Sequence, residues 1–249
     1  MLYRLEKLIG LSIGASDGTL GKIQDVYFDD HRWAVRYLVV ETGDWLTGRK
    51  VLISPISVES IDWIQKVVRV RLNKQQVKGS PQIDTEMPVS RQHEVSLLDY
   101  YGFPDYWTGS LLWGATPYPV RPSYELVENR SPSTAPVPND LYLRSLNEVK
   151  DYPLEATDAA IGTLEDFVVD NGSWALRYVV ADTREWLIGK HLVIPTLWVR
   201  KLEWKARTFF VDMPHAMVMK APEYDPTIAL SREYETALFG HYERPGYWF

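Results

Sequence analysis

The chain has 249 residues, a net charge of −6 and no cysteine. The absence of cysteine excludes disulfide bonds, thiolate metal sites and cysteine nucleophiles. This length fits one large domain or two small ones, and the sequence pI of about 5.4 argues against a nucleic-acid-binding surface dominated by Lys and Arg. The chain start shows no secretory signal, and no apolar run is long enough to span a membrane, so we expect a cytoplasmic protein.

An internal repeat divides the chain. A shift of 141 residues superposes residues 1–108 on 142–249 without a gap, and about 30 positions are then identical. Eight of the ten tryptophans form four of these pairs, such as Trp33 with Trp174. We therefore expect two tandem domains of one fold, at 1–108 and 141–249. The Pro-rich segment 109–140 between them predicts a semi-extended linker.

The first predicted elements of each copy are two strands that form a hairpin. In the second copy, Leu164–Asp170 and Ser173–Val180 are β-rich runs that flank an Asn-Gly dipeptide at 171–172. This dipeptide is typical of two-residue turns. A two-residue loop fixes the register of the two strands, and the equivalent runs of the first copy give the same set of pairs.

The predicted register places an acid opposite a base in both copies. Asp25 lies opposite Arg36, and Asp166 lies opposite Arg177. We interpret these four residues as cross-strand ion pairs that help to fix the register, each worth roughly 0.2 to 1 kcal/mol. The alternative is a proton-transfer or docking site that occurs once in each copy.

Two further strands and one helix follow in each copy. Ser90 and Ser231 are predicted N-cap residues, because apolar residues at helical spacing follow each of them. Several short strands at this spacing indicate a small β-barrel, so the expected fold is mainly β with one or two helices per repeat. The predicted strands are Lys50–Ile53, Val67–Leu72, His191–Ile194 and Thr208–Met213.

Each copy ends on the same aromatic string, Tyr-x-x-Pro-x-Tyr-Trp. Tyr and Trp are the residue types that anchor interfaces. Three interpretations stay open: each tail packs over its own barrel, the tails pack on the opposite repeats as a pseudo-twofold, or the tails bind a partner. The candidate interaction residues are Tyr101, Tyr106, Trp107, Tyr242, Tyr247 and Trp248.

Four segments of the first copy carry a family resemblance. They are the Leu-Ile-Gly at 8–10, the run from Asp17 to Val26, the apolar strand at 37–40, and 51–53 with Pro55. These segments resemble the PRC-barrel family, found as the cytoplasmic domain of the photosynthetic reaction centre H subunit and as the C-terminal domain of a ribosome maturation factor. The second copy keeps fewer of these residues. The resemblance implies two tandem small β-barrels that are used for docking.

The residue types that usually carry catalysis or metal binding do not form a repeated site. None of the five histidines recurs in the other copy, and a metal site generally needs three or four ligands. The common enzyme motifs are absent. We therefore expect no catalytic residue, no cofactor and no metal. The cations Lys66, Arg69 and Arg71 predict a solvated strand face rather than a phosphate-binding site.

The resulting functional hypothesis is a non-enzymatic cytoplasmic docking protein whose partner is a protein or membrane complex. One alternative is an enzyme or small-molecule binder with a site between the two halves, for which His191, Trp198 and Trp113 are the candidates. A second alternative is association with the ribosome or its RNA, which predicts salt-sensitive binding.

Overall fold

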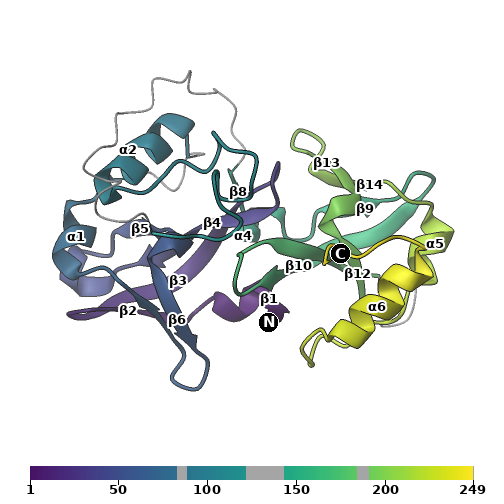
Figure 1. The fold of residues 1–249 in the computed structure, drawn as a ribbon, viewed down its shortest axis with the longest axis horizontal. Helices are drawn as coiled ribbons and strands as arrows, with labels where there is room; N and C mark the ends of the chain where they lie inside the picture. The colour runs from purple at the N-terminus through teal and green to yellow at the C-terminus, as the bar shows by residue number, and fades with distance from the viewer. Residues whose placement is uncertain (83–88, 122–142, 184–190, 249) are drawn as a thin grey trace. The chain divides into compact units, whose positions relative to one another are not determined.

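The computed structural model describes residues 1–82, 89–121, 143–183 and 191–248. The chain forms two compact units (Figure 1). The N-unit comprises Leu8–Ser145, and the C-unit comprises Met1–Lys7 together with Leu146–Phe249. Each unit is mainly β and contains one seven-stranded sheet.

The N-unit sheet has the strand order β5-β4-β3-β2-β7-β6, and β8 adds to β3 beside β2. The β2–β7 pair is parallel, whereas the other pairs are antiparallel. The strands are β2 (Ser12–Ala15), β3 (Gly18–Asp29), β4 (Ala34–Glu41), β5 (Lys50–Ile53), β6 (Val58–Asp62), β7 (Val67–Val70) and β8 (Leu143–Ser145). The helices are α1 (Lys74–Gly79), α2 (Arg91–Tyr101) and the 3-10 turns η1 (Leu5–Leu8, which begins in the C-unit), η2 (Gly43–Leu46) and η3 (Pro55–Ser57).

The C-unit sheet repeats this arrangement with the order β12-β11-β10-β9-β14-β13, and β1 adds to β10. The β14–β9 pair is again parallel. The strands are β1 (Leu2–Arg4), β9 (Pro153–Glu155), β10 (Ala160–Asp170), β11 (Leu176–Asp182), β12 (His191–Pro195), β13 (Val199–Glu203) and β14 (Thr208–Val211). The helices are α4 (Leu146–Val149), α5 (His215–Met219), α6 (Arg232–His241) and the 3-10 turn η4 (Thr196–Trp198).

The predicted strands and helix caps are confirmed. All four predicted later strands are present as β5, β7, β12 and β14, and their observed ends differ from the predicted ends by at most two residues. The side chain of Ser90 accepts a hydrogen bond from the backbone N–H of His93, and that of Ser231 accepts one from Tyr234. Among the described residues the pairings follow an open path from one end strand to the other, so a closed barrel stays a prediction.

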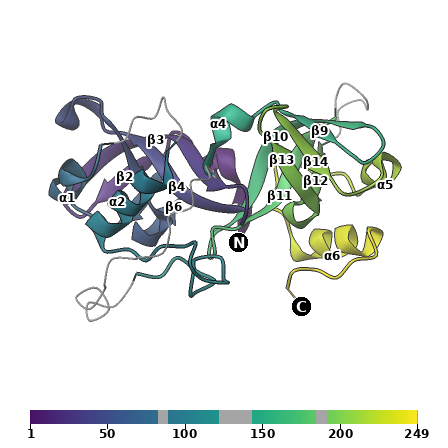
Figure 2. The same ribbon diagram turned by 90° about the horizontal axis from the view of Figure 1, so that it is seen from above.

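The first strand of each repeat joins the sheet that the other repeat forms. β1 pairs antiparallel with β10, with Leu2 opposite Asp170, and β8 pairs with β3, with Leu143 opposite Asp29. In Figures 1 and 2 the purple β1 lies beside the green β10. The chain therefore passes from one unit to the other at Lys7, and again at Ser145. The compact units thus differ from the sequence repeats at their first strands.

The hairpin after β3 is longer than the predicted two-residue turn. The carboxylate of Asp29 accepts hydrogen bonds from the backbone N–H groups of His31 and Arg32, at 2.9 and 3.1 Å. Trp33 then takes a left-handed conformation with φ 51°, and the equivalent Trp174 has φ 59°. This side-chain-to-backbone turn closes a four-residue loop in place of the Asn-Gly type.

The longer loop changes the register, so the predicted register is wrong. Asp25 lies opposite Val39 and Asp166 lies opposite Val180, because the loop and the bulges along β3 and β10 shift the pairing. Neither predicted acid–base pair is therefore a cross-strand neighbour. Arg36 pairs instead with Asp29, at the end of its own hairpin.

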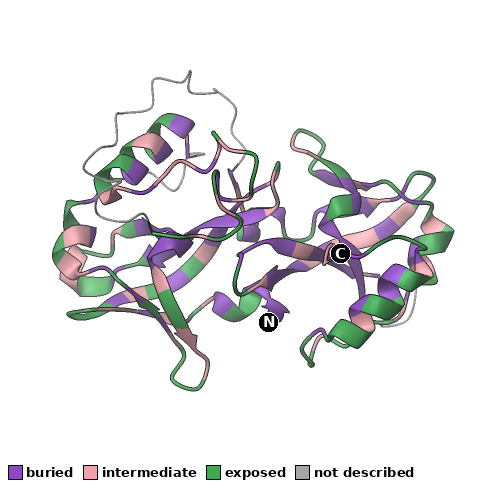
Figure 3. Ribbon diagram, viewed as in Figure 1, coloured by how far each residue is buried: buried purple, intermediate pink, exposed green. Residues whose placement is uncertain are grey.

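The core of each unit lies on the buried faces of its sheet (Figure 3). In the C-unit, α6 covers one sheet face (Figure 2). From this helix Phe239 packs on Tyr178 and Trp198. One glycine in each sheet is required by close packing of backbone. A Cβ on Gly21 would overlap the carbonyl of Glu41, and a Cβ on Gly162 would overlap the carbonyl of the equivalent aspartate.

Candidate functional site

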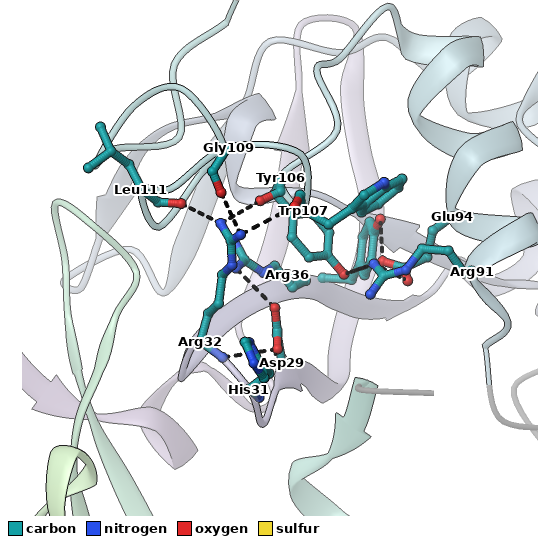
Figure 4. Close-up of polar contacts among 11 residues, drawn as sticks. Asp29, His31, Arg32, Arg36, Arg91, Glu94, Tyr106, Trp107, Gly109 and Leu111 are labelled. Atoms are coloured by element: carbon teal, nitrogen blue, oxygen red, sulfur yellow. Dashed lines mark hydrogen bonds and ion pairs between the residues drawn. The ribbon is translucent and has the colours of Figure 1, made fainter. Parts of the chain in front are cut away.

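A buried carboxylate in the N-unit binds several polar side chains (Figure 4). Glu94 projects from α2 and is 2% exposed. Its carboxylate accepts hydrogen bonds from the hydroxyls of Tyr37 on β4 (3.2 Å) and Tyr106 in the tail (2.5 Å). Arg91, one helical turn earlier, pairs with it at 2.9 Å and donates to the Tyr106 hydroxyl at 2.7 Å. This cluster ties helix, sheet and tail together.

The C-unit contains the same cluster. The carboxylate of Glu235 accepts hydrogen bonds from the hydroxyls of Tyr178 at 2.6 Å and Tyr247 at 2.8 Å, and it pairs with Arg232 at 3.1 Å. The side chain of Arg232 is 53% exposed, whereas that of its N-unit counterpart Arg91 is 5% exposed. The recurrence of all four residue types at a spacing of 141 shows that the cluster serves the fold common to both copies.

The two arginines predicted to form cross-strand pairs support the tails. Arg36 is fully buried, and its guanidinium lies 3.8 Å from the centre of the Tyr106 ring and 4.7 Å from that of Trp113. Its Nη2 also pairs with Asp29 at 3.1 Å. The equivalent Arg177 lies 4.1 Å from the centre of the Tyr247 ring. Both arginines therefore hold a tail tyrosine by cation–π contact.

The structure places the aromatic tails on their own units. Tyr106 and Tyr242 are each 3% exposed, and the remaining tail rings are half-buried. Trp107 stacks with Arg91, and Trp248 packs on α6. These contacts support the interpretation that each tail packs over its own unit, and a role of the half-buried rings in binding a partner stays a prediction.

Asp25 and Asp166, the other predicted ion-pair residues, contact the exchanged strands. Asp166 is fully buried and binds Arg4 of β1, with Nε and Oδ2 3.0 Å apart. Asp25 accepts a hydrogen bond from the hydroxyl of Ser145 on β8 at 2.5 Å. Burial raises the pKa of Asp166 to about 7, against the lowering effects of the Phe167 N–H and of Arg4.

Arginine 32 fixes the chain that follows the first tail, a contact that sequence reasoning missed. Its guanidinium donates to the carbonyl oxygens of Tyr106, Trp107, Gly109 and Leu111, at 2.5 to 3.3 Å (Figure 4). Arg suits this role because its rigid guanidinium carries five N–H donors that can bind several carbonyl oxygens at once. The other copy has Ser173 at this position, so comparison of the repeats gave no signal for it.

The fixed chain forms a surface that we call the platform, residues 109–121. Within it, Trp113 is buried against Arg36. In contrast, Leu111, Tyr118 and Val120 are 44%, 57% and 52% exposed. The rest of the predicted linker, 122–140, lies outside the described residues.

The three residues considered for an enzymatic site are each engaged within one unit. His191 Nδ1 lies 2.6 Å from Glu165, Trp198 packs on Tyr242, and Trp113 covers an arginine. Among the described residues, no group of three or more His, Asp or Glu side chains could hold a metal ion. In the same part of the chain, no helix is long and apolar enough to cross a membrane.

The fold and the buried clusters define a protein of two similar β-sheet units, each closed by a C-terminal helix and an aromatic tail. Residues 1–77 match the family model of the PRC-barrel domain, which confirms the resemblance for the first copy. The matched range includes β1. In this structure β1 pairs with β10 of the C-unit, and β8 pairs with β3. No curated protein matches the chain.

The buried carboxylate of Glu94 makes stability depend on pH. Burial raises its pKa to about 7, opposed by Arg91 and by the hydroxyl of Tyr106. Because folding favours the protonated form, the contribution of Glu94 to the free energy of unfolding is greatest below its unfolded pKa of roughly 4.3 and is lost as pH rises through about 7. Glu94→Gln cannot titrate, so we expect wild type to lose a few kcal/mol relative to this variant across that range.

Urea denaturation of both proteins between about pH 4 and pH 8 measures the difference, and wild type should fall towards or below the variant as pH rises. Glu59→Gln, at an exposed position of β6, is the matched control and should follow wild type. Parallel pH curves for wild type and Glu94→Gln would contradict the assignment.

Proposed function

We propose that this protein is a non-enzymatic cytoplasmic docking protein, in which two PRC-barrel-like units related by the repeat present a recognition surface to a partner protein or complex. The platform carries this proposal. It exposes three large apolar side chains, at Leu111, Tyr118 and Val120, and Arg32 holds its first residues through the carbonyls of Gly109 and Leu111. Exposed large apolar side chains this close together in the sequence suit an interaction site.

The way the platform is held supports binding rather than catalysis. Binding costs conformational entropy when loops must become ordered, so a surface that is already fixed loses less of it. The platform is also bonded internally, since Trp113 N–H donates to the carbonyl of Thr116 and the Thr116 hydroxyl donates to the carbonyl of Tyr118. A partner would therefore meet preformed apolar anchors.

The repeated polar residues also fit this proposal. In each copy the buried glutamate, its arginine and two tyrosine hydroxyls satisfy one another and fasten the tail to the sheet. Their chemistry is accounted for by folding, which leaves the unrepeated platform as the feature to explain. The absence of cysteine suits a reducing cytoplasm.

The platform is tested by a triple variant, Leu111→Ser, Tyr118→Ser and Val120→Ser, in the tagged full chain at native expression level. The matched control replaces three exposed apolar residues elsewhere, each more exposed than the platform residues, by Ile64→Ser, Leu197→Ser and Ile228→Ser. We expect wild type and control to capture the same partner, and the platform variant to capture at least about tenfold less, with unchanged melting. Equal capture by all three proteins would contradict the platform as the docking surface, and salt-sensitive enrichment of ribosomal RNA would favour ribosome association instead.

A further inference from the structure

We propose that the edges of β3 and β10 that β8 and β1 occupy are sequence-selective binding sites for the first strand of the opposite repeat, so that the two halves of the chain recognise each other through exchanged strands. The inference does not depend on the docking function. It rests on the side chains that β1 and β8 place against their acceptor strands.

The backbone does not select between exchanged and unexchanged strands. Leu2 lies opposite Asp170 and Leu143 lies opposite Asp29, so both strands bind their acceptors in the same register. Both leucines are 8% exposed and fill equivalent positions. Either strand could therefore form the same ladder of hydrogen bonds on either sheet, and selection must come from the two residues that follow each leucine.

On β10, the first strand meets two acids. Arg4 Nε lies 3.0 Å from Asp166 Oδ2, and its Nη2 lies 2.8 Å from Glu165 Oε1. The bulge of β10 at residue 165 turns the second carboxylate to this side. At the equivalent positions β3 has Gln24 and Asp25, so Arg4 would meet only one acid on the sheet of its own repeat.

On β3, the strand of the second copy also finds a partner that its own sheet lacks. Arg144 Nε lies 2.7 Å from Asp30 Oδ2, and both side chains are largely buried. The residue equivalent to Asp30 beside β10 is the neutral Asn171. The neighbouring Ser145 donates a hydrogen bond to Asp25.

Both strands therefore gain more from the opposite repeat than from their own. The unexchanged arrangement would leave the carboxylates of Asp166 and Asp30 without their arginines, and an unpaired buried charge is strongly unfavourable. Selectivity that combines attraction in one pairing with unpaired charge in the other is the usual basis of specific recognition.

Cleavage of the full chain between the repeats tests the proposal. A protease recognition sequence is inserted between Arg121 and Leu143, and the folded protein is cut and examined by size exclusion with light scattering. We expect the two fragments to stay together as a 1:1 complex at low micromolar concentration. Separation of the wild-type fragments into folded monomers would overturn the proposal.

Selectivity is tested by exchanging the two dipeptides, with Tyr3→Arg and Arg4→Ser in β1 and Arg144→Tyr and Ser145→Arg in β8. Composition and charge are unchanged, but each strand now suits its own sheet. The cut variant should bind at least about a hundredfold more weakly than cut wild type. Undiminished association would overturn the selectivity.

A second variant guards against misfolding of the first. Asp30→Asn combined with Asn171→Asp moves the carboxylate that binds Arg144 from the loop after β3 to the loop after β10. Neither loop lies in the core, and the change should also weaken association of the cut chain. The control exchanges an exposed pair on β13, Lys201→Glu with Glu203→Lys, and should bind like wild type. If both acceptor and control variants bind like wild type, the charges do not select the strands.

Discussion

Replacing Arg4 with methionine will destabilise the folded chain by roughly 3 to 5 kcal/mol at about pH 8. The loss arises because Asp166 is fully buried and keeps only backbone donors, such as the N–H of Glu6, once the guanidinium is gone. Methionine preserves the apolar stem, so the change reports mainly on the charge. Urea denaturation of the purified full chain measures the loss.

The loss should depend on pH in a defined direction. Burial raises the pKa of Asp166 to about 7 in wild type, so its contribution to stability is largest in acid and falls as pH rises through that value. Without Arg4 the pKa rises further, so the loss should be smallest at about pH 6 and should grow by up to about 1.4 kcal/mol per pH unit above about pH 7. Arg69→Met, at an exposed position of β7, is the control. A constant difference across this range would contradict the buried pair.

The second large effect is expected at Gly162, where alanine should cost about 3 kcal/mol or more. The added Cβ would overlap the carbonyl oxygen of Asp182, which is backbone and cannot move without opening the pairing of β10 with β11. Thermal denaturation followed by far-ultraviolet circular dichroism measures the loss.

A glycine without this constraint provides the matched control. Gly240 lies near the end of α6, and a Cβ there meets nothing within 4 Å. Gly240→Ala should therefore stabilise by roughly 0.5 to 1 kcal/mol, because alanine restricts the unfolded chain and favours helix. Equal effects of the two substitutions would show that close backbone approach at Gly162 is not the constraint.

Local patterns in the sequence predicted the elements well but the hairpin register badly. Lys50–Ile53 is a β-strand with the predicted bounds, and Ser90 caps its helix, because both depend on residues near in sequence. The register depended on the loop, where the Asp29 carboxylate and the left-handed Trp33 replace the two-residue turn. An Asn-Gly dipeptide in one copy was a weaker guide than an Asp and a Trp found in both.

The repeat predicted the cluster only in part. Tyr106 and Arg36 were singled out because they recur, and the structure brings them into contact. The features that differ between the copies were missed, since comparison of repeats emphasises what is shared. Arg4 and Arg32 have serine at the equivalent positions, yet one holds the exchanged strand and the other holds the platform.

Strand exchange could not be predicted from the repeat itself. Leu2 and Leu143 are equivalent, so any pattern that predicts a strand in one copy predicts it in the other without saying which sheet it joins. The choice depends on contacts between residues about 160 positions apart, such as Arg4 with Asp166. Such pairs leave no periodic signal along the chain.

The most direct test of the exchanged strands is a set of nuclear Overhauser contacts in the wild-type protein, labelled selectively at backbone and methyl groups. The structure predicts contacts of β1 with Val168 and Val169, and of Leu143 with Phe28 and Asp29. Contacts of β1 with Phe28 and Asp29 instead would show that each repeat keeps its own first strand, and would contradict the account.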